Sequence, residues 1–283
     1  MNNIMLASFS CKLWPVQRQD RRITSAIATK VGLGGKSGVF KKFRINTHRD
    51  EWLRITRNRD AFRAFHYAMT IPYKHGASLL NPLAFDEYQD RFNAAQIEHD
   101  DAVNAFFLNL DSILAEARLA LTTDDGTCYF RESDYADLTP DAFTFDMLVE
   151  PLVHDATFDA FSDLIGAEKA QELADKLAAE NDRAFRASVD SVSQRVSDAL
   201  MRAADRLHNA ERWNPSAVEA LQELTDLLPV LNITNDPKIE QTRKQIASLF
   251  RAYSVDSFND KATRQSCAHK VDQILSKFGR SGS

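Results

Sequence analysis

Residues 80–106 read LNPLAFDEYQDRFNAAQIEHDDAVNAF, and this stretch predicts the helix around which the rest of the chain is arranged. Its apolar and aromatic residues recur at alternating steps of three and four, which is the heptad spacing of a helix that has a partner. This seam consists of Phe85, Tyr88, Phe92, Ala95, His99, Ala102 and Phe106. Asn81 is a favoured N-cap residue and Pro82 a favoured first helical residue, so we predict a helix from Asn81 to Leu121.

A second long segment, from Ala167 to Trp213, carries a thin apolar seam that includes Val189, Val192 and Val196. A narrow seam is typical of a coiled-coil partner rather than of a helix on a broad core. The two segments together predict a long antiparallel coiled-coil-like helical hairpin. His99 lies in the middle of the first seam, where a polar residue usually fixes the register.

The fold class predicted is mainly α, with a helical bundle and a small antiparallel β element at the base of the hairpin. Alternating apolar residues at 4–13 and 143–149, with a shorter run at 127–131, predict the strands. Further helices are predicted at 17–31 and 48–69 and near 157–165. The X-Pro pairs Asn214-Pro215 and Asp236-Pro237 predict two more helix starts, and a last helix covers about 258–278.

Four regions follow from this pattern. Residues 1–80 form a basic N-terminal region that packs on the base, and residues 81–213 form the hairpin with an inserted β/loop segment. Residues 214–278 form the C-terminal helices, and the small and polar tail 279–283 is predicted to be disordered.

The charge distribution is strongly uneven along the chain. Residues 1–75 contain 15 Lys/Arg and four Asp/Glu, whereas the remaining residues contain 20 Lys/Arg and 36 Asp/Glu. Such asymmetry predicts either contact with an anionic partner or docking onto the protein's own acidic part, and it does not distinguish them. The basic residues that could contact a nucleic acid or a protein partner are Arg18, Arg21, Arg22, Lys36, Lys41, Lys42, Arg44, Arg49, Arg57 and Arg63.

No pattern of residues indicates catalysis. The Gly35-Lys36-Ser37 tripeptide lacks the glycine that a phosphate-binding loop needs five residues earlier, where Lys30 stands, so a flexible hinge is the better interpretation. The seven histidines show no metal-ligand spacing, and Cys267-Ala268-His269 has the wrong spacing for one helix face. We therefore expect no cofactor, no metal and no enzymatic activity.

Composition also limits the location of the protein. No apolar run is long enough to cross a membrane, and the first residues make a poor signal peptide. Cys11, Cys128 and Cys267 are widely separated, which favours free thiols in a reducing cytoplasm.

The order of several features resembles a known family. Arg57 to Phe65, Thr70-Ile71-Pro72-Tyr73, Leu79-Leu80-Asn81-Pro82, Phe143-Thr144-Phe145, Glu150-Pro151 and Leu231-Asn232-Ile233 follow one another as in the domain of unknown function 3150 family. This helical family is associated with phages and bacteria and has no established catalytic residues, so none is transferred. Its genes often lie near those of MoxR-type AAA+ ATPases and von Willebrand factor A-like proteins. The resemblance implies an adaptor in an ATPase system, inside a bacterial host cell.

Three functions remain as hypotheses. The first is a non-enzymatic interaction or adaptor protein, with an AAA+ ATPase or a second copy of the chain as its partner. The second is nucleic-acid binding in phage replication, recombination or packaging through the basic N-terminal region, where aromatic residues are interleaved with Lys and Arg. The third is a structural component of the virion.

Overall fold

A computed structural model describes residues 4–31, 41–152, 165–209, 216–253 and 255–280. The fold is mainly α-helical with a small antiparallel sheet, as predicted. The chain divides into two compact units. Unit 1 consists of Met1–Ser8, Phe65–Tyr88 and Leu148–Ser283, and unit 2 consists of Phe9–Ala64 and Gln89–Met147. The predicted regions follow the order of the chain, whereas each unit collects segments that are remote in sequence.

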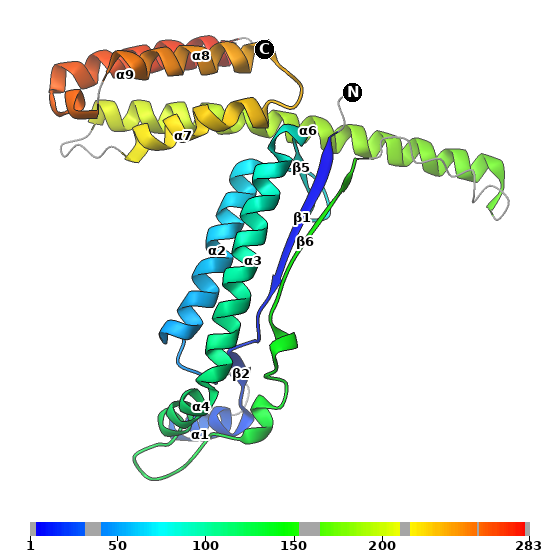
Figure 1. Ribbon diagram of the computed structural model, residues 1–283, viewed down its shortest axis with the longest axis vertical. Coiled ribbons are helices and arrows are strands. Elements are labelled where there is room, and N and C mark those ends of the chain that lie inside the picture. Colours follow the sequence, from blue (N-terminus) through cyan, green and yellow to red (C-terminus); the bar gives the residue numbers. More distant parts are fainter. Residues whose placement is uncertain (1–3, 32–40, 153–164, 210–215, 254, 281–283) are drawn as a thin grey trace. The chain divides into compact units, whose positions relative to one another are not determined.

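Unit 1 is dominated by the 43-residue helix α6, Ala167–Asn209. Helices α7 (Ser216–Leu231), α8 (Pro237–Ala252) and α9 (Lys261–Arg280) form a bundle with one half of α6 (Figure 1). Buried aliphatic residues from all four helices form one core, among them Val196, Leu200, Leu221, Ile246 and Val271. The packing of these side chains, rather than helix propensity, is what stabilises such helices.

The sheet has the strand order β4-β5-β1-β6, with bounds Ile71–Pro72, Ser78–Leu80, Met5–Lys12 and Thr144–Pro151. Strand β1 pairs antiparallel with β5 in a register that places Met5 opposite Leu80. Strands β1 and β6 match the alternation at residues 4–13 and 143–149. Residues 127–131, which we predicted as a third strand, form no strand in the structure. An isolated bridge joins Thr122 to Cys128 there.

Unit 2 contains α1 (Arg21–Val31), α4 (Leu110–Ala120), most of α2 (Asp50–Met69) and most of α3 (Phe85–Leu108). Strands β2 (Gln17–Gln19) and β3 (Lys41–Phe43) pair antiparallel. Aromatic side chains fill its interior, with the rings of Phe62 and Phe92 5.5 Å apart. The predicted helix 17–31 is wrong over its first residues. Asp20 follows β2 and caps α1, accepting hydrogen bonds from the amides of Arg22 and Ile23.

The start of the central helix is confirmed, but its predicted length is wrong. Asn81 Oδ1 accepts a hydrogen bond from the Leu83 amide and caps a short 3-10 turn that leads into α3. The helix is interrupted at Asn109, whose φ and ψ of −101° and 10° are not helical. Buried residues on both sides, Phe106 and Ile113, belong to the same core cluster. Tertiary packing therefore bends a segment whose sequence pattern is continuous.

The predicted coiled-coil hairpin is not confirmed. In unit 2, α3 packs against α2: Asn58 Nδ2 donates to the Ala95 carbonyl at 2.7 Å, and Arg54 pairs with Glu98. In unit 1, α6 packs against α7 and α9. The seam residues do face inward, since Tyr88, Phe92, His99, Phe106, Val192 and Val196 are buried and Phe85 and Val189 are half-buried. Their partners, however, lie on other elements than predicted: Phe92 and His99, for example, contact Phe145 on β6.

The predicted start of α8 is confirmed, the Asn214-Pro215 pair lies outside the described residues, and the predicted tail is wrong in part. Asp236 Oδ1 accepts from the Lys238 amide, and Pro237 is the first residue of α8. Helix α9 continues to Arg280, so the first two residues of the predicted disordered tail are helical. The predicted helix near 157–165 and the hinge at 32–38 lie almost entirely outside the described residues.

Candidate interaction surface

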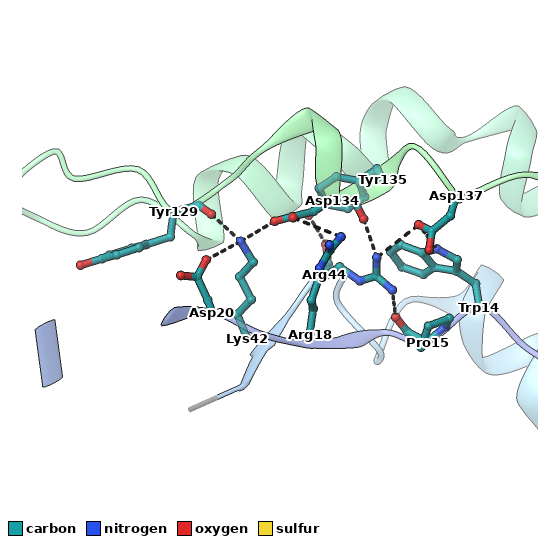
Figure 2. Close-up of polar contacts among 10 residues, drawn as sticks. All are labelled: Trp14, Pro15, Arg18, Asp20, Lys42, Arg44, Tyr129, Asp134, Tyr135 and Asp137. Carbon is teal, nitrogen blue, oxygen red and sulfur yellow. Dashed lines mark hydrogen bonds and ion pairs between the residues drawn. The ribbon is translucent and has the colours of Figure 1, made fainter. Parts of the chain in front are cut away.

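Lys42 lies at the centre of a buried charge network in unit 2. Its side chain is 3% exposed, and its Nζ is 2.9 Å from Asp20 Oδ2 and 2.7 Å from Asp134 Oδ2. Nζ also donates to the Tyr129 carbonyl at 2.7 Å (Figure 2). An ammonium group has three hydrogens, and here all three have acceptors. The lysine therefore joins the paired strands β2 and β3 to the segment around residues 129–134.

The carboxylate of Asp20 is kept ionised by its contacts. Burial acts to raise its pKa, but hydrogen bonds from Lys42 and from the amides of Ile23 and Arg22 lower the pKa below its ordinary value. Breaking a buried ion pair by removing one partner costs about 3–5 kcal/mol, because the other charge stays buried. This network therefore stabilises the local fold.

Arg44 forms the second half of the same network. Its guanidinium lies 3.5 Å from the ring centroid of Trp14 and donates to the carbonyls of Pro15 and Asp134. Asp137 accepts from Trp14 Nε1 at 3.0 Å and lies 3.4 Å from Arg44 Nη1. Burial lowers the pKa of the Arg44 guanidinium, and the charge of Asp137 opposes that shift. The planar guanidinium can stack on an aromatic ring and bond carbonyls at once, which a lysine cannot.

Tyr135 is a further member of this network. Its hydroxyl donates to the Arg44 carbonyl at 2.6 Å, and its ring stacks on Phe130 and Trp14. Burial raises the pKa of Tyr135 to about 12, so the hydroxyl remains a hydrogen-bond donor at neutral pH. The backbone just after β3 is thus held by a side chain from a segment some ninety residues later.

The charges of unit 2 balance within the unit. Residues 9–64 contain 14 Lys/Arg and four Asp/Glu, and residues 89–147 contain three Lys/Arg and 13 Asp/Glu, which gives 17 of each sign. Several pairs join the two segments directly, including Arg49 with Glu116 at 2.8 Å and Arg54 with Glu98 at 2.6 Å. Of the two interpretations of the charge asymmetry, the pairs favour docking of the basic segment on the protein's own acidic segment.

The ten predicted contact residues therefore separate into groups. Lys42 and Arg44 are buried and paired, which is a correction: their side chains are unavailable to an external partner. Arg49 is held by Glu51 and Glu116, Arg18 lies 3.3 Å from Asp134, and Arg63 lies 3.9 Å from Asp60. The side chains that remain exposed without an ion pair among the described contacts are those of Arg21, Arg22, Lys41 and Arg57. Lys36 lies outside the described residues.

A groove of about 430 Å³ lies between the β3 region and α4 in unit 2. Its apolar lining comes from Phe43, Ile45, Ala117, Ala120 and Leu121. Phe43 is 54% exposed, because alternation along β3 turns Lys42 and Arg44 inward and Phe43 outward. We call this feature the β3–α4 groove.

The rim of the β3–α4 groove is polar and rigid. Asn46, Thr47, His48 and Glu116 line it, and Asn46 Nδ2 donates to Glu116 Oε1 at 2.7 Å. Hydrogen bonds from Asn46 and Arg49 lower the pKa of Glu116, so this carboxylate remains ionised at neutral pH. An apolar floor with a few fixed polar groups is the usual composition of a recognition site.

The described residues around the groove offer little for catalysis. Cys128 is exposed, and a hydrogen bond with Thr122 lowers the pKa of its thiol. No histidine contact with Cys128 is present among the described residues, so the base that would activate a nucleophilic pair is missing there. All three cysteines are free, as predicted.

Comparison with protein-family models, with curated proteins and with solved structures finds no match to this chain. The family resemblance of the sequence and its implied ATPase system stay predictions. Within the described residues, no helix combines the length and apolarity that crossing a bilayer requires.

Sequence reasoning missed the acidic and aromatic half of the network, namely Trp14, Asp20, Asp134, Tyr135 and Asp137. One signal was present in Lys41-Lys42-Phe43-Arg44, where period-two alternation places the two buried cations on one face. The pattern looked like an ordinary basic segment because buried Lys and Arg are rare without partners. Some of their partners, Asp134 and Asp137, lie about ninety residues away, where no local pattern connects them.

Proposed function

We propose that the chain is a non-enzymatic interaction protein and that the β3–α4 groove is its contact surface. The observation that carries the proposal is the exposed Phe43 beside a concave apolar lining. Aromatic residues, Phe among them, are enriched at protein interfaces, where a few well-packed anchors carry most of the binding energy. The groove is large enough for one or two apolar side chains of a partner segment.

The surrounding network supports this proposal because it makes the groove rigid before binding. The buried contacts of Lys42 and Arg44 hold β3 in place. Arg49 and Asn46 hold Glu116 on α4. A pre-organised surface loses little conformational entropy on association, so more of its contact energy appears as affinity. Glu116 at the rim favours a partner whose apolar anchor is flanked by a basic or amide side chain.

Affinity purification from the producing cell, with nuclease treatment, tests the proposal. Ala120→Glu places a carboxylate in the groove at an exposed position, and Phe43→Glu removes the apolar anchor. Both variants should lose the same co-purifying protein that the wild type retains. Leu119→Glu is the matched control, since Leu119 is the neighbouring residue on α4, is 77% exposed and does not line the groove.

Two outcomes contradict the proposal: retention of the partner by both groove variants, or equal loss in the Leu119→Glu control. Deleting residues 121–135 would not test this surface, because it would also remove Tyr129, Asp134 and Tyr135 from the buried network. Identification of the retained protein as an AAA+ ATPase would support the adaptor function that the family resemblance implies.

Nucleic-acid binding is the second candidate. Its supporting observation is the set of exposed basic side chains without an ion pair among the described contacts, Arg21, Arg22 and Lys41, of which Lys41 lies on the same strand as the exposed Phe43. The equal numbers of basic and acidic residues in unit 2 weaken it. Filter binding over a salt series tests it: Arg21→Glu with Arg22→Glu should reduce affinity and flatten the dependence of log affinity on log salt. Arg57→Glu is the control, and absence of binding at low salt excludes this function.

A further inference from the structure

Two histidines and one aspartate meet at the packed pair α6 and α9 in unit 1. His208 lies in the last turn of α6, and His269 and Asp272 are three residues apart on α9, a spacing that places them on one face. Nitrogen or carboxylate oxygen atoms, one from each of the three residues, all lie within 4.8 Å of one another. His208 Nε2 is 2.8 Å from Asp272 Oδ2, and the two imidazole centroids are 5.4 Å apart.

The backbone beneath these three side chains is fixed by the core. Leu207, next to His208, is 2% exposed, and the neighbours of the α9 pair, Ala268 and Val271, are fully buried in the same cluster. The ligand side chains themselves remain exposed, so small rotations are available to them. A rigid frame with adjustable ligands is what a metal site between two helices requires.

We propose that His208, His269 and Asp272 bind a Zn²⁺ ion that clips the end of α6 to α9. Zinc is bound by imidazole nitrogen and carboxylate oxygen at about 2.0–2.2 Å, which separates tetrahedral ligand atoms by about 3.4 Å. The present separations reach this value with shifts of roughly 1 Å in exposed side chains. Three protein ligands leave a fourth position for water. Two nitrogen ligands favour zinc over magnesium or calcium, which prefer oxygen.

This site differs from the Cys267–His269 pair that the sequence suggested and that we rejected. The Cys267 side chain is fully buried in the core, so it points away from the exposed cluster. The third ligand comes from His208, sixty-four residues before Asp272, which explains why no ligand spacing was visible in the sequence. The proposal is independent of the β3–α4 groove, which lies in unit 2.

Calorimetric titration of the full chain with ZnCl₂ at pH 7.5, under reducing conditions, tests this proposal. We expect one equivalent to bind and the melting temperature to rise with zinc concentration. His208→Ala and His269→Ala should each weaken binding by about tenfold or more, since even outer-shell changes cost that much. Asp272→Asn preserves the shape of the side chain and should weaken binding as well. His75→Ala, which removes an exposed histidine outside the cluster, should leave affinity unchanged.

Co²⁺ provides a second readout that does not depend on stability. The wild type should give the intense visible absorption of four-coordinate cobalt, and both histidine variants should lose it. Circular dichroism on the metal-free variants checks that they fold, which we expect because all three ligands are exposed. Absence of stoichiometric binding by the wild type, or equal binding by the wild type and both histidine variants, overturns the proposal.

Discussion

The two units bury different kinds of side chain. Unit 1 has an aliphatic core contributed mainly by α6, α7, α8 and α9. Every Lys, Arg, Asp and Glu that is buried among the described residues lies in unit 2, namely Asp20, Lys42, Arg44 and Asp134. Aliphatic packing tolerates many arrangements of similar volume, whereas a buried charge tolerates only an arrangement that supplies its partner. Unit 2 should therefore be the less tolerant of substitution at charged positions.

The largest effect is expected for Lys42→Met in unit 2. This change removes the cation and leaves the carboxylates of Asp20 and Asp134 buried without it, at a cost of about 3–5 kcal/mol in the free energy of unfolding. Lys41→Met is the matched control at the adjacent, exposed position and should change stability by less than about 0.5 kcal/mol. Urea denaturation of both variants measures the difference. Equal stability would mean that the network contributes little to the fold.

Leu200→Ala tests the aliphatic core of unit 1. Leu200 is fully buried on α6, and its truncation should cost about 3 kcal/mol through lost burial and the cavity that remains. Met201→Ala, at the next position and 46% exposed, should cost much less. Thermal denaturation of the pair gives the comparison. A small effect of Leu200→Ala would show that this core is loosely packed.

The third prediction concerns His66 in unit 1, which is buried beside Tyr88 and Ser78. Burial lowers its pKa to about 4, so the unfolded state, with a pKa near 6.5, binds the proton more readily. Its contribution is present above about pH 6.5 and is lost as the pH falls toward 4. Between pH 7 and pH 5 this amounts to about 2 kcal/mol. Urea denaturation at both pH values should show a smaller loss for His66→Gln than for the wild type, and equal losses would contradict the assignment.

Substitution of His99 in unit 2 by leucine should raise the stability of the protein, whereas the same substitution of His66 should lower it. It is 1% exposed, and neither ring nitrogen has a hydrogen-bond partner in the part of the chain that the structure describes. An unsatisfied buried polar group is costly, so His99→Leu should raise stability at pH 7 by about 1 kcal/mol. His66→Leu, which removes the group that Tyr88 contacts, should lower it. Calorimetric melting at pH 7 compares the two. Destabilisation by His99→Leu would indicate that the imidazole has a role beyond packing.

Burial also lowers the pKa of His99, so its substitution bears on the pH dependence of unit 2. The depressed pKa means that the unfolded state binds the proton more readily, so the destabilisation caused by His99 grows as the pH falls below about 6.5. The melting temperature of His99→Leu should therefore decline less than that of the wild type on acidification. Parallel curves would show that His99 does not sense pH and is a structural residue of the α3 seam.

The sequence by itself determined the features that depend on neighbours a few residues away. The Asn81-Pro82 and Asp236-Pro237 starts are set by a side chain that bonds an amide two residues on, and the apolar period identified which faces of α3 and α6 turn inward. Such interactions do not depend on the rest of the fold. For the same reason the sequence indicated a mainly α-helical chain and the strands β1 and β6.

Only the tertiary structure decided which faces meet and which charges are hidden. An apolar face on α3 fits α2 as well as it would fit α6, so periodicity could not select the partner. The bend at Asn109 follows from packing on both sides of it. Arg44 is a surface residue by its own chemistry, and it becomes a core residue because Asp134 and Asp137 accept from its terminal nitrogen and Trp14 stacks on its guanidinium. The β3–α4 groove and the His208 cluster likewise arise from side chains that meet only after the chain has folded.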